Sequence, residues 1–177
     1  MSAPSKGFTL LELVVALAIA GALLIFAIPG WRAYIADLEI RDRVDALVEM
    51  LSLARSEAIR RNGRVNLCPS ADQKTCSDTG AWETGWLVYV DLDDDGAPDA
   101  AERIVRVEGQ ARPGITIRGN RPVSDYVSYT PTGHTRMRNG ALQMGTFTIC
   151  RTGQSAVHVV LANGGRVRVD RTGVACP

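Results

Sequence analysis

The segment 91–102 has the residue types and the spacing that a hard cation requires. Its carboxylates stand at positions 1, 3, 5, 9 and 12, with a glycine at position 6, and they belong to Asp91, Asp93, Asp95, Asp99 and Glu102. Calcium takes about six to eight oxygen ligands, and loops with this spacing can supply them. However, strands are expected on both sides, and Pro98 replaces the usual apolar residue at position 8. These features favour a solvated hairpin turn without metal, and calcium binding by the five acids is the alternative.

A second segment, 162–173, has residue types suited to binding phosphate. Asn163-Gly164 predicts a hairpin turn. In the strand after it, Arg166 and Arg168 are expected on one face, about 6.6 Å apart, because side chains alternate along a strand. Guanidinium groups form paired hydrogen bonds with phosphate. Three more arginines could extend this patch: Arg171 in the tail, and Arg136 and Arg138 on either side of Met137. The alternative is an exposed strand face that carries arginines and binds nothing.

The charge of the chain is distributed unevenly, although its formal net value is only +1. The segment 72–108 holds ten acidic residues and three basic ones, whereas 136–177 holds six arginines and the single acid Asp170. Lysine occurs only at Lys6 and Lys74, so nearly all positive charge is guanidinium. This composition favours bidentate or stacking contacts over diffuse attraction.

No group of residues has the spacing of a catalytic site. His134 lies in a loop, His158 alternates with valines, and the sequence near Ser155 supplies no acid to orient a histidine. A zinc site is disfavoured because the chain has no CxxC motif and only two histidines. We therefore predict a protein that is not an enzyme and that needs no cofactor.

Four cysteines follow the apolar N-terminal segment. An even number beyond a membrane segment predicts two disulfides in an oxidising compartment. Four cysteines allow three pairings. We favour Cys68–Cys76, which closes a local loop, and Cys150–Cys176, which would fix the C-terminus to a strand.

The elements that must position these residues begin with a long helix. The segment from Phe8 to Trp31 is an apolar run of 24 residues in which Glu12 is the only charged residue. About 20 apolar residues are enough to cross a bilayer as a helix. Beyond it, apolar residues recur at steps of four and three and predict an amphipathic continuation: Ile40, Val44, Leu47, Leu51, Ala54 and Ala58. Asn62-Gly63 is expected to end the helix.

After Gly63 the hydrophobic period changes to two, which predicts strands. Eight are expected, at 64–68, 85–90, 103–108, 115–118, 126–130, 146–150, 156–161 and 165–170, and the last two form a C-terminal hairpin. One long helix followed by antiparallel strands is an α+β architecture. The helix should pack on the antiparallel sheet or sheets through its apolar stripe.

The N-terminus resembles the prepilin peptidase signal of type IV pilins and type II secretion pseudopilins. The residues that carry the resemblance are Gly7-Phe8-Thr9-Leu10-Leu11-Glu12, after a short leader with Lys6. It implies cleavage between Gly7 and Phe8, N-methylation of Phe8, and pairing of Glu12 with the terminal amine of a neighbouring subunit. The chain would comprise a leader at 1–7, a transmembrane and filament-core helix half at 8–31, an amphipathic half at 32–63, and a periplasmic or extracellular β domain at 64–177.

The whole chain resembles the GspH/FimT family of minor pilins and pseudopilins. The resemblance rests on the helix-to-strand junction "LARSEAIRRNGRVNLCPS" and on the Trp-x-x-Gly-Trp strand that leads into the Asp-rich turn. It implies a pilin-like fold and a low-abundance subunit, inserted in the inner membrane before assembly and displayed on the cell surface afterwards. Gly165-Arg166-Val167-Arg168 resembles the DNA-binding motif of FimT-type minor pilins used in natural transformation.

Two functions follow from these resemblances. In the first, the subunit joins other pilins at the pilus tip and binds the phosphate backbone of double-stranded DNA without sequence preference. In the second, it is a structural minor pilin or a type II secretion pseudopilin that primes filament assembly and binds no DNA.

Overall fold

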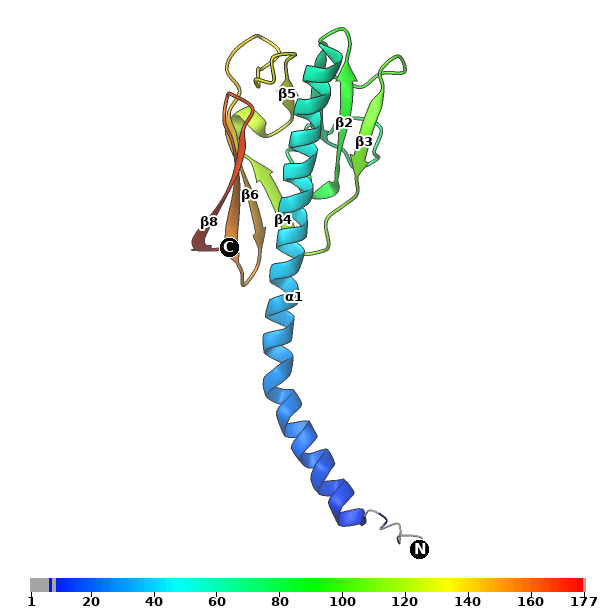
Figure 1. The fold of residues 1–177 in the computed structure, drawn as a ribbon, viewed down its shortest axis with the longest axis vertical. Coiled ribbons are helices and arrows are strands. Elements are labelled where there is room, and N and C mark those ends of the chain that lie inside the picture. The colour runs from blue at the N-terminus through cyan, green and yellow to red at the C-terminus, as the bar shows by residue number, and fades with distance from the viewer. Residues whose placement is uncertain (1–6, 8, 177) are drawn as a thin grey trace, which may run out of the picture. The chain divides into compact units, whose positions relative to one another are not determined.

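The computed structural model describes residue 7 and residues 9–176. The chain divides into two compact units, with the boundary between Asp37 and Leu38. One helix, α1, runs without interruption from Leu10 to Arg61 and contributes to both units. The second unit also contains all of the strands (Figure 1).

The helix begins with a cap formed by Thr9. The Thr9 hydroxyl accepts a hydrogen bond from the backbone N–H of Glu12 at 3.2 Å, and its carbonyl accepts one from Leu13. Thr9 and Glu12 therefore have the spacing of a capping box. A carboxylate in the first turn also interacts favourably with the helix dipole, so Glu12 favours this start of the helix in addition to any role in assembly.

The helix ends at Asn62-Gly63, as the sequence predicted, and Asn62 is the residue with left-handed backbone conformation. Asn62 has a φ of 50°, and its N–H bonds to the carbonyl of Ile59. The N–H of Gly63 reaches back to the carbonyl of Ala58 at 3.2 Å. This is a Schellman motif with asparagine at the left-handed position, whereas Gly63 is not among the residues with positive φ.

In the first unit the large apolar side chains of α1 are exposed. Leu10 is 81% exposed and Leu24 57% exposed, and Trp31 and Tyr34 contact each other at a ring-centroid distance of 6.1 Å. Within the described residues, no helix is both long and apolar enough to cross a membrane.

The strands form two antiparallel sheets of four strands each. The first sheet has the order β3-β2-β1-β5, with β1 at Arg64–Pro69, β2 at Trp86–Asp91, β3 at Ile104–Glu108 and β5 at Val127–Tyr129. The second has the order β4-β6-β7-β8, with β4 at Ile115–Gly119, β6 at Gly145–Arg151, β7 at Ser155–Leu161 and β8 at Val167–Ala175. The predicted α+β architecture, with one long helix and antiparallel sheets, is confirmed.

A single core joins the second half of α1 to both sheets. All six residues of the predicted apolar stripe are at most 4% exposed, and Met50 joins them. Trp82 and Phe147 meet edge to face at 5.0 Å beneath the sheets. The period of the apolar residues thus identified the buried face of the helix correctly.

The structure differs from the predicted elements in two places. Two short 3-10 helices, η1 at Trp82–Thr84 and η2 at Arg121–Val123, precede β2 and β5. Strand β8 also extends five residues past Asp170, the predicted end, because it keeps pairing with β7 as far as Ala175.

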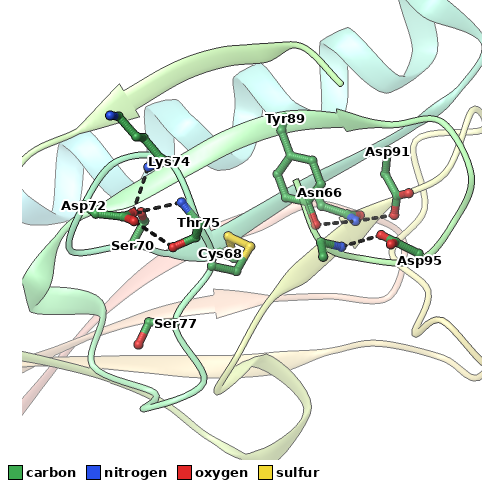
Figure 2. The surroundings of a disulfide bond; sticks show 12 residues. Asn66, Cys68, Ser70, Asp72, Lys74, Thr75, Ser77, Tyr89, Asp91 and Asp95 are labelled. Carbon is green, nitrogen blue, oxygen red and sulfur yellow. Dashed lines mark hydrogen bonds between the residues drawn. A yellow bond between two sulfur atoms is a disulfide. The ribbon is translucent and has the colours of Figure 1, made fainter. Parts of the chain in front are cut away.

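Each sheet carries one disulfide. Cys68 on β1 is bonded to Cys76, with Cα atoms 5.6 Å apart, and Cys150 on β6 is bonded to Cys176, with Cα atoms 5.5 Å apart. Asp72 lies in the loop that the first disulfide closes, and its carboxylate accepts hydrogen bonds from the backbone of Lys74 and Thr75 (Figure 2). These hydrogen bonds hold the pKa of Asp72 well below its usual range.

Candidate nucleic-acid interface

The turn between β7 and β8 is longer than the sequence predicted. The N–H of Gly165 bonds to the carbonyl of Ala162, and the N–H of Ala162 bonds to the carbonyl of Arg166. Gly165, at a φ of 74°, is the residue in the left-handed region. This pattern is that of a three-residue loop with a bulge, not of a two-residue turn at Asn163-Gly164.

Gly165 is required by packing as well as by its backbone conformation. A Cβ atom there would overlap the carbonyl oxygen of Gly133 and approach the ring of Tyr129 at 3.0 Å. The N–H of Thr135 also bonds to the carbonyl of Asn163. The loop 133–135 therefore supports the hairpin turn and fixes the position from which the next arginines emerge.

Arg166 lies in the turn and Arg168 lies on β8, and both are exposed. Arg168 pairs in register with Val160 on β7, so it stands on the sheet face opposite to the core-facing Val159 and Leu161. A hollow of about 640 Å³ borders both arginines. Residues of β6, β7 and β8 contribute to its lining, among them Thr146 and Val160, together with Met144 just before β6. The two predicted arginines thus flank one concave surface.

Asp170 shares the face of Arg168, a neighbour that was not predicted. Its carboxylate forms an ion pair with the Arg168 guanidinium at 3.1 Å, and the Arg168 side chain remains 71% exposed. Strand alternation alone could have found this neighbour, because the two residues are two positions apart. The pair leaves most of the guanidinium accessible to an anion.

Arg171 does not lie in a tail, as the sequence predicted. It lies within β8, in register with Val157. Because directly opposite residues of antiparallel strands share a face, Arg171 is on the same side as Val157 and Val159. It therefore does not share the face of Arg168.

Arg136 and Arg138 also have different surroundings. Arg136 follows Thr135, whose backbone bonds to the hairpin turn. Arg138 instead packs over the ring of Tyr126 at 5.2 Å, and its guanidinium donates to the backbone carbonyl of Asp95 at 2.6 Å. Arg138 is therefore bound to the loop between β2 and β3 that contains Asp95, whereas Arg136 lies next to a residue that contacts the β7–β8 turn.

The acidic loop joins β2 to β3 and brings three of its predicted ligands together. One carboxylate oxygen each from Asp91, Asp93 and Asp95 lie within 4.8 Å of one another. Asp99 uses its carboxylate to accept hydrogen bonds from the backbone N–H groups of Ala101 and Glu102.

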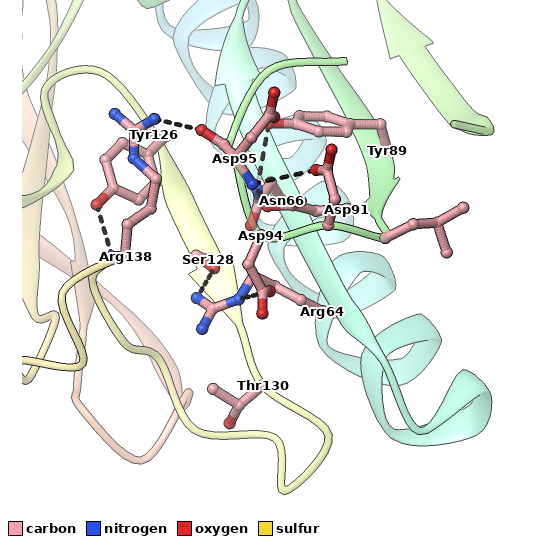
Figure 3. A network of polar contacts seen from close by, with 12 residues as sticks. Arg64, Asn66, Tyr89, Asp91, Asp94, Asp95, Tyr126, Ser128, Thr130 and Arg138 are labelled. Atoms are coloured by element: carbon pink, nitrogen blue, oxygen red, sulfur yellow. Dashed lines mark hydrogen bonds and ion pairs between the residues drawn. The ribbon is translucent and has the colours of Figure 1, made fainter. Parts of the chain in front are cut away.

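Asp91 is the buried member of this group, and it belongs to a polar network within the first sheet (Figure 3). Its side chain accepts a hydrogen bond from the Asn66 amide at 2.5 Å, and the same amide donates to the Tyr89 hydroxyl at 3.1 Å. Burial raises the pKa of Asp91 and, more strongly, that of Tyr89. Asn66, a polar residue between the apolar Val65 and Leu67 of β1, was the available signal for this network.

The predicted processing site lies mostly outside the described residues. Phe8 is not described, Gly7 is exposed, and Glu12 lies in the exposed first turn of α1. The His134 ring forms a hydrogen bond with the Thr132 hydroxyl, and His158 pairs in register with Asp170 on β8.

The comparison with protein families decides what kind of chain this is. A family model described as Type II transport protein GspH matches residues 43–173. The chain belongs to the GspH family. A second model, the prokaryotic N-terminal methylation motif, matches residues 3–28. The GspH match spans nearly the whole β domain described above.

Solved structures with the same fold include two minor subunits. The type IV minor pilin FimU of Pseudomonas aeruginosa has a TM-score of 0.61 at 19% identity, and the alignment covers 81% of this chain and 96% of FimU. The minor pseudopilin EpsH from the type 2 secretion system of Vibrio cholerae has a TM-score of 0.51 at 14% identity, over 75% and 97% of the two chains. Likeness at these identities concerns the fold.

A curated relative is the type IV major fimbrial protein FimA of Dichelobacter nodosus. It is 31% identical over 100 residues, which is 56% of this chain. The match spans 57% of the length of that relative.

Proposed function

We propose that this chain is a minor type IV pilin that binds double-stranded DNA through the β7–β8 hairpin for uptake in natural transformation. The observation that carries the DNA-binding proposal is the position of Arg166 and Arg168. Both are exposed beside one hollow, at a turn that packing against Gly133 holds in place. Exposed guanidinium groups beside one concave surface suit phosphate oxygens and provide no base readout.

Arg136 and Arg171 have secondary parts in this proposal. Arg136 can add a phosphate contact next to the turn, whereas Arg171 lies on the other sheet face and would reach only DNA that wraps around the edge strand β8. Arg138 already bonds to the Asp95 carbonyl, so we assign it no DNA contact. The function requires no catalytic residue and no cofactor for binding.

The experiment is a fluorescence anisotropy titration of the full chain in detergent with a short labelled DNA duplex. The wild type should bind several unrelated sequences equally, with affinity that falls steeply as salt rises, because phosphate contacts release counterions. Arg166→Ala and Arg168→Ala should each weaken binding about five- to tenfold and reduce the salt slope by about one.

Arg103→Ala is the matched control, since Arg103 is an exposed arginine beside the first sheet. It should leave the affinity nearly unchanged. Absence of wild-type binding at low salt would leave only the structural function. Equal losses in the control and the two hairpin variants would refute the assignment of the site.

We also propose how the subunit enters a filament. A prepilin peptidase would cut between Gly7 and Phe8 and the new amine of Phe8 would be methylated, as the match to the methylation motif supports. Residues 8–31 would lie in the inner membrane and then in the filament core, where the exposed apolar side chains of α1 would pack against other pilins.

Glu12 would pair with the terminal amine of a neighbouring subunit, because a charge among apolar helices is tolerated when it is paired. Glu12→Ala should therefore spare membrane insertion and reduce incorporation into filaments at least about tenfold, as measured by immunoblots of membranes and of sheared filaments. Glu12→Gln removes the charge but keeps a side chain that can take part in a capping box, so it tests the effect of the charge alone. Normal incorporation of both variants would contradict the pairing.

The alternative is a structural subunit of a type II secretion pseudopilus. The fold match to EpsH and the exposed apolar surface of α1 favour it equally well. The two functions share the assembly role of α1 and differ only in the task of the hairpin.

A further inference from the structure

We propose that the loop between β2 and β3 binds a calcium ion through the carboxylates of Asp91, Asp93, Asp95 and Glu102. The first three already converge, with one oxygen from each within 4.8 Å of the others. They occupy positions 1, 3 and 5 of a twelve-residue segment whose last position is Glu102. This is the order in which calcium loops present their acidic ligands.

Convergence of acids alone does not define a site, and the buried state of Asp91 adds independent support. Its side chain is 3% exposed, and its Oδ1 atom has no hydrogen-bond partner among the described residues. The other oxygen accepts from the Asn66 amide. A buried carboxylate with an unpaired oxygen is costly unless a cation neutralises it, and Asp91 is one of the three converging acids.

Glu102 shows the same feature at the other end of the loop. Its Oε1 accepts a hydrogen bond from the backbone N–H of Leu92 at 2.7 Å, which holds the end of the loop against its start. Its Oε2 is buried and has no hydrogen-bond partner among the described residues. Buried Asp91 and half-buried Glu102 therefore each have one buried carboxylate oxygen without a hydrogen-bond partner among the described residues.

The neighbouring arginines form their ion pairs and hydrogen bonds with other groups, although the charge of Arg64 favours ionised Asp91. Arg64 forms an ion pair with Asp94 at 2.5 Å and donates to the Ser128 hydroxyl. Arg138 donates to a backbone carbonyl, that of Asp95 (Figure 3). In the described part of the chain, none of the four proposed ligands forms an ion pair with a basic side chain, so the charge remains for a cation.

The ligand chemistry selects calcium among cations. All of the proposed side-chain ligands are carboxylates, which suit hard cations and not the metals that prefer nitrogen or sulfur. Magnesium usually takes only one or two carboxylates and keeps its waters, whereas calcium accepts several carboxylates in a flexible loop. Four carboxylates on one connection between strands therefore fit calcium better.

The test is isothermal titration calorimetry of the full chain in detergent, stripped with a chelator and titrated with calcium chloride. We expect one site with a dissociation constant on the order of 10⁻⁵ to 10⁻³ M. Millimolar calcium should also raise the Tm of the chain, since a ligand that binds only the folded state stabilises it. Magnesium at the same concentration should give a smaller shift.

The variants compare acids within the loop. Asp93→Asn and Glu102→Gln should each weaken calcium binding at least about tenfold, because each removes a charged ligand. Asp94→Asn is the matched control: it removes the same charge from the same loop, but Asp94 pairs with Arg64 and is not a proposed ligand. It should change the affinity less than about threefold. Absence of wild-type binding, or equal losses in Asp93→Asn and Asp94→Asn, would overturn the proposal, and neither result bears on DNA binding by the arginine hairpin.

Discussion

The connections β2–β3 and β7–β8 both join antiparallel neighbours, but they hold their charges in opposite ways. In the acidic loop the charged groups converge, and Asp91 is buried beside Asn66. In the arginine hairpin Arg166 and Arg168 point into solvent. A buried charge affects the stability of the fold, because desolvation penalises it in the absence of a partner. An exposed charge affects mainly what the surface attracts. The first region should therefore be studied through stability and the second through affinity and its salt dependence.

The largest expected difference between the two connections is in the free energy of unfolding that a substitution of their glycines costs. Gly165 and Gly96 both have positive φ, at 74° and 78°. A Cβ atom at Gly165 would overlap a backbone carbonyl, whereas one at Gly96 would meet the Arg138 side chain at 2.6 Å, which can move away. Gly165→Ala should lower the free energy of unfolding by about 3 to 4 kcal/mol and Gly96→Ala by about 1 to 2 kcal/mol.

Urea unfolding of the two variants measures this difference. Gly164→Ala is the control, since no heavy atom lies within 4 Å of a Cβ built there and its φ is not positive. It should change the unfolding free energy by less than about 0.5 kcal/mol. Equal losses for Gly165→Ala and Gly96→Ala would show that backbone conformation alone decides the cost.

A smaller effect on DNA affinity tests which face of the hairpin meets DNA. Asp170 is the acid that shares the face of Arg168. If this face meets DNA, Asp170→Asn should tighten binding about two- to fivefold, because it removes both a competitor for the guanidinium and a charge that repels phosphate. The same anisotropy titration measures it, with Asp78→Asn, an exposed acid near the first disulfide, as the control. An unchanged affinity for Asp170→Asn would place the DNA elsewhere.

The sequence was sufficient where one strong periodic signal decided the structure. The steps of four and three from Ile40 identified the buried face of α1, and alternation located the first seven strands to within about one residue of their bounds. The helix end at Asn62-Gly63 was also predicted correctly. In these places local conformation and burial favour the same structure, so pattern and fold agree.

The sequence was insufficient where tertiary contacts chose between local options. Asn163-Gly164 is a strong signal for a two-residue turn, yet packing against Gly133 moves the left-handed residue to Gly165. The sequence grouped Arg138 with the hairpin arginines because it belongs to the same basic third of the chain. In the structure it packs over the Tyr126 ring and donates to the Asp95 carbonyl. The length of β8 likewise follows from its pairing with β7 and not from its own residues. All of these partners lie outside the local segment whose pattern was read.

The disulfide between Cys150 and Cys176 has a mechanical consequence for the hairpin. The bond joins β6 to the residue after β8, so β7, the turn and β8 form a covalently closed ring. A long polymer held at the turn would transmit tension into this ring. Breaking the hydrogen bonds of edge strand β8 would then loosen the strand without freeing its end, and the hairpin could re-form once the tension falls.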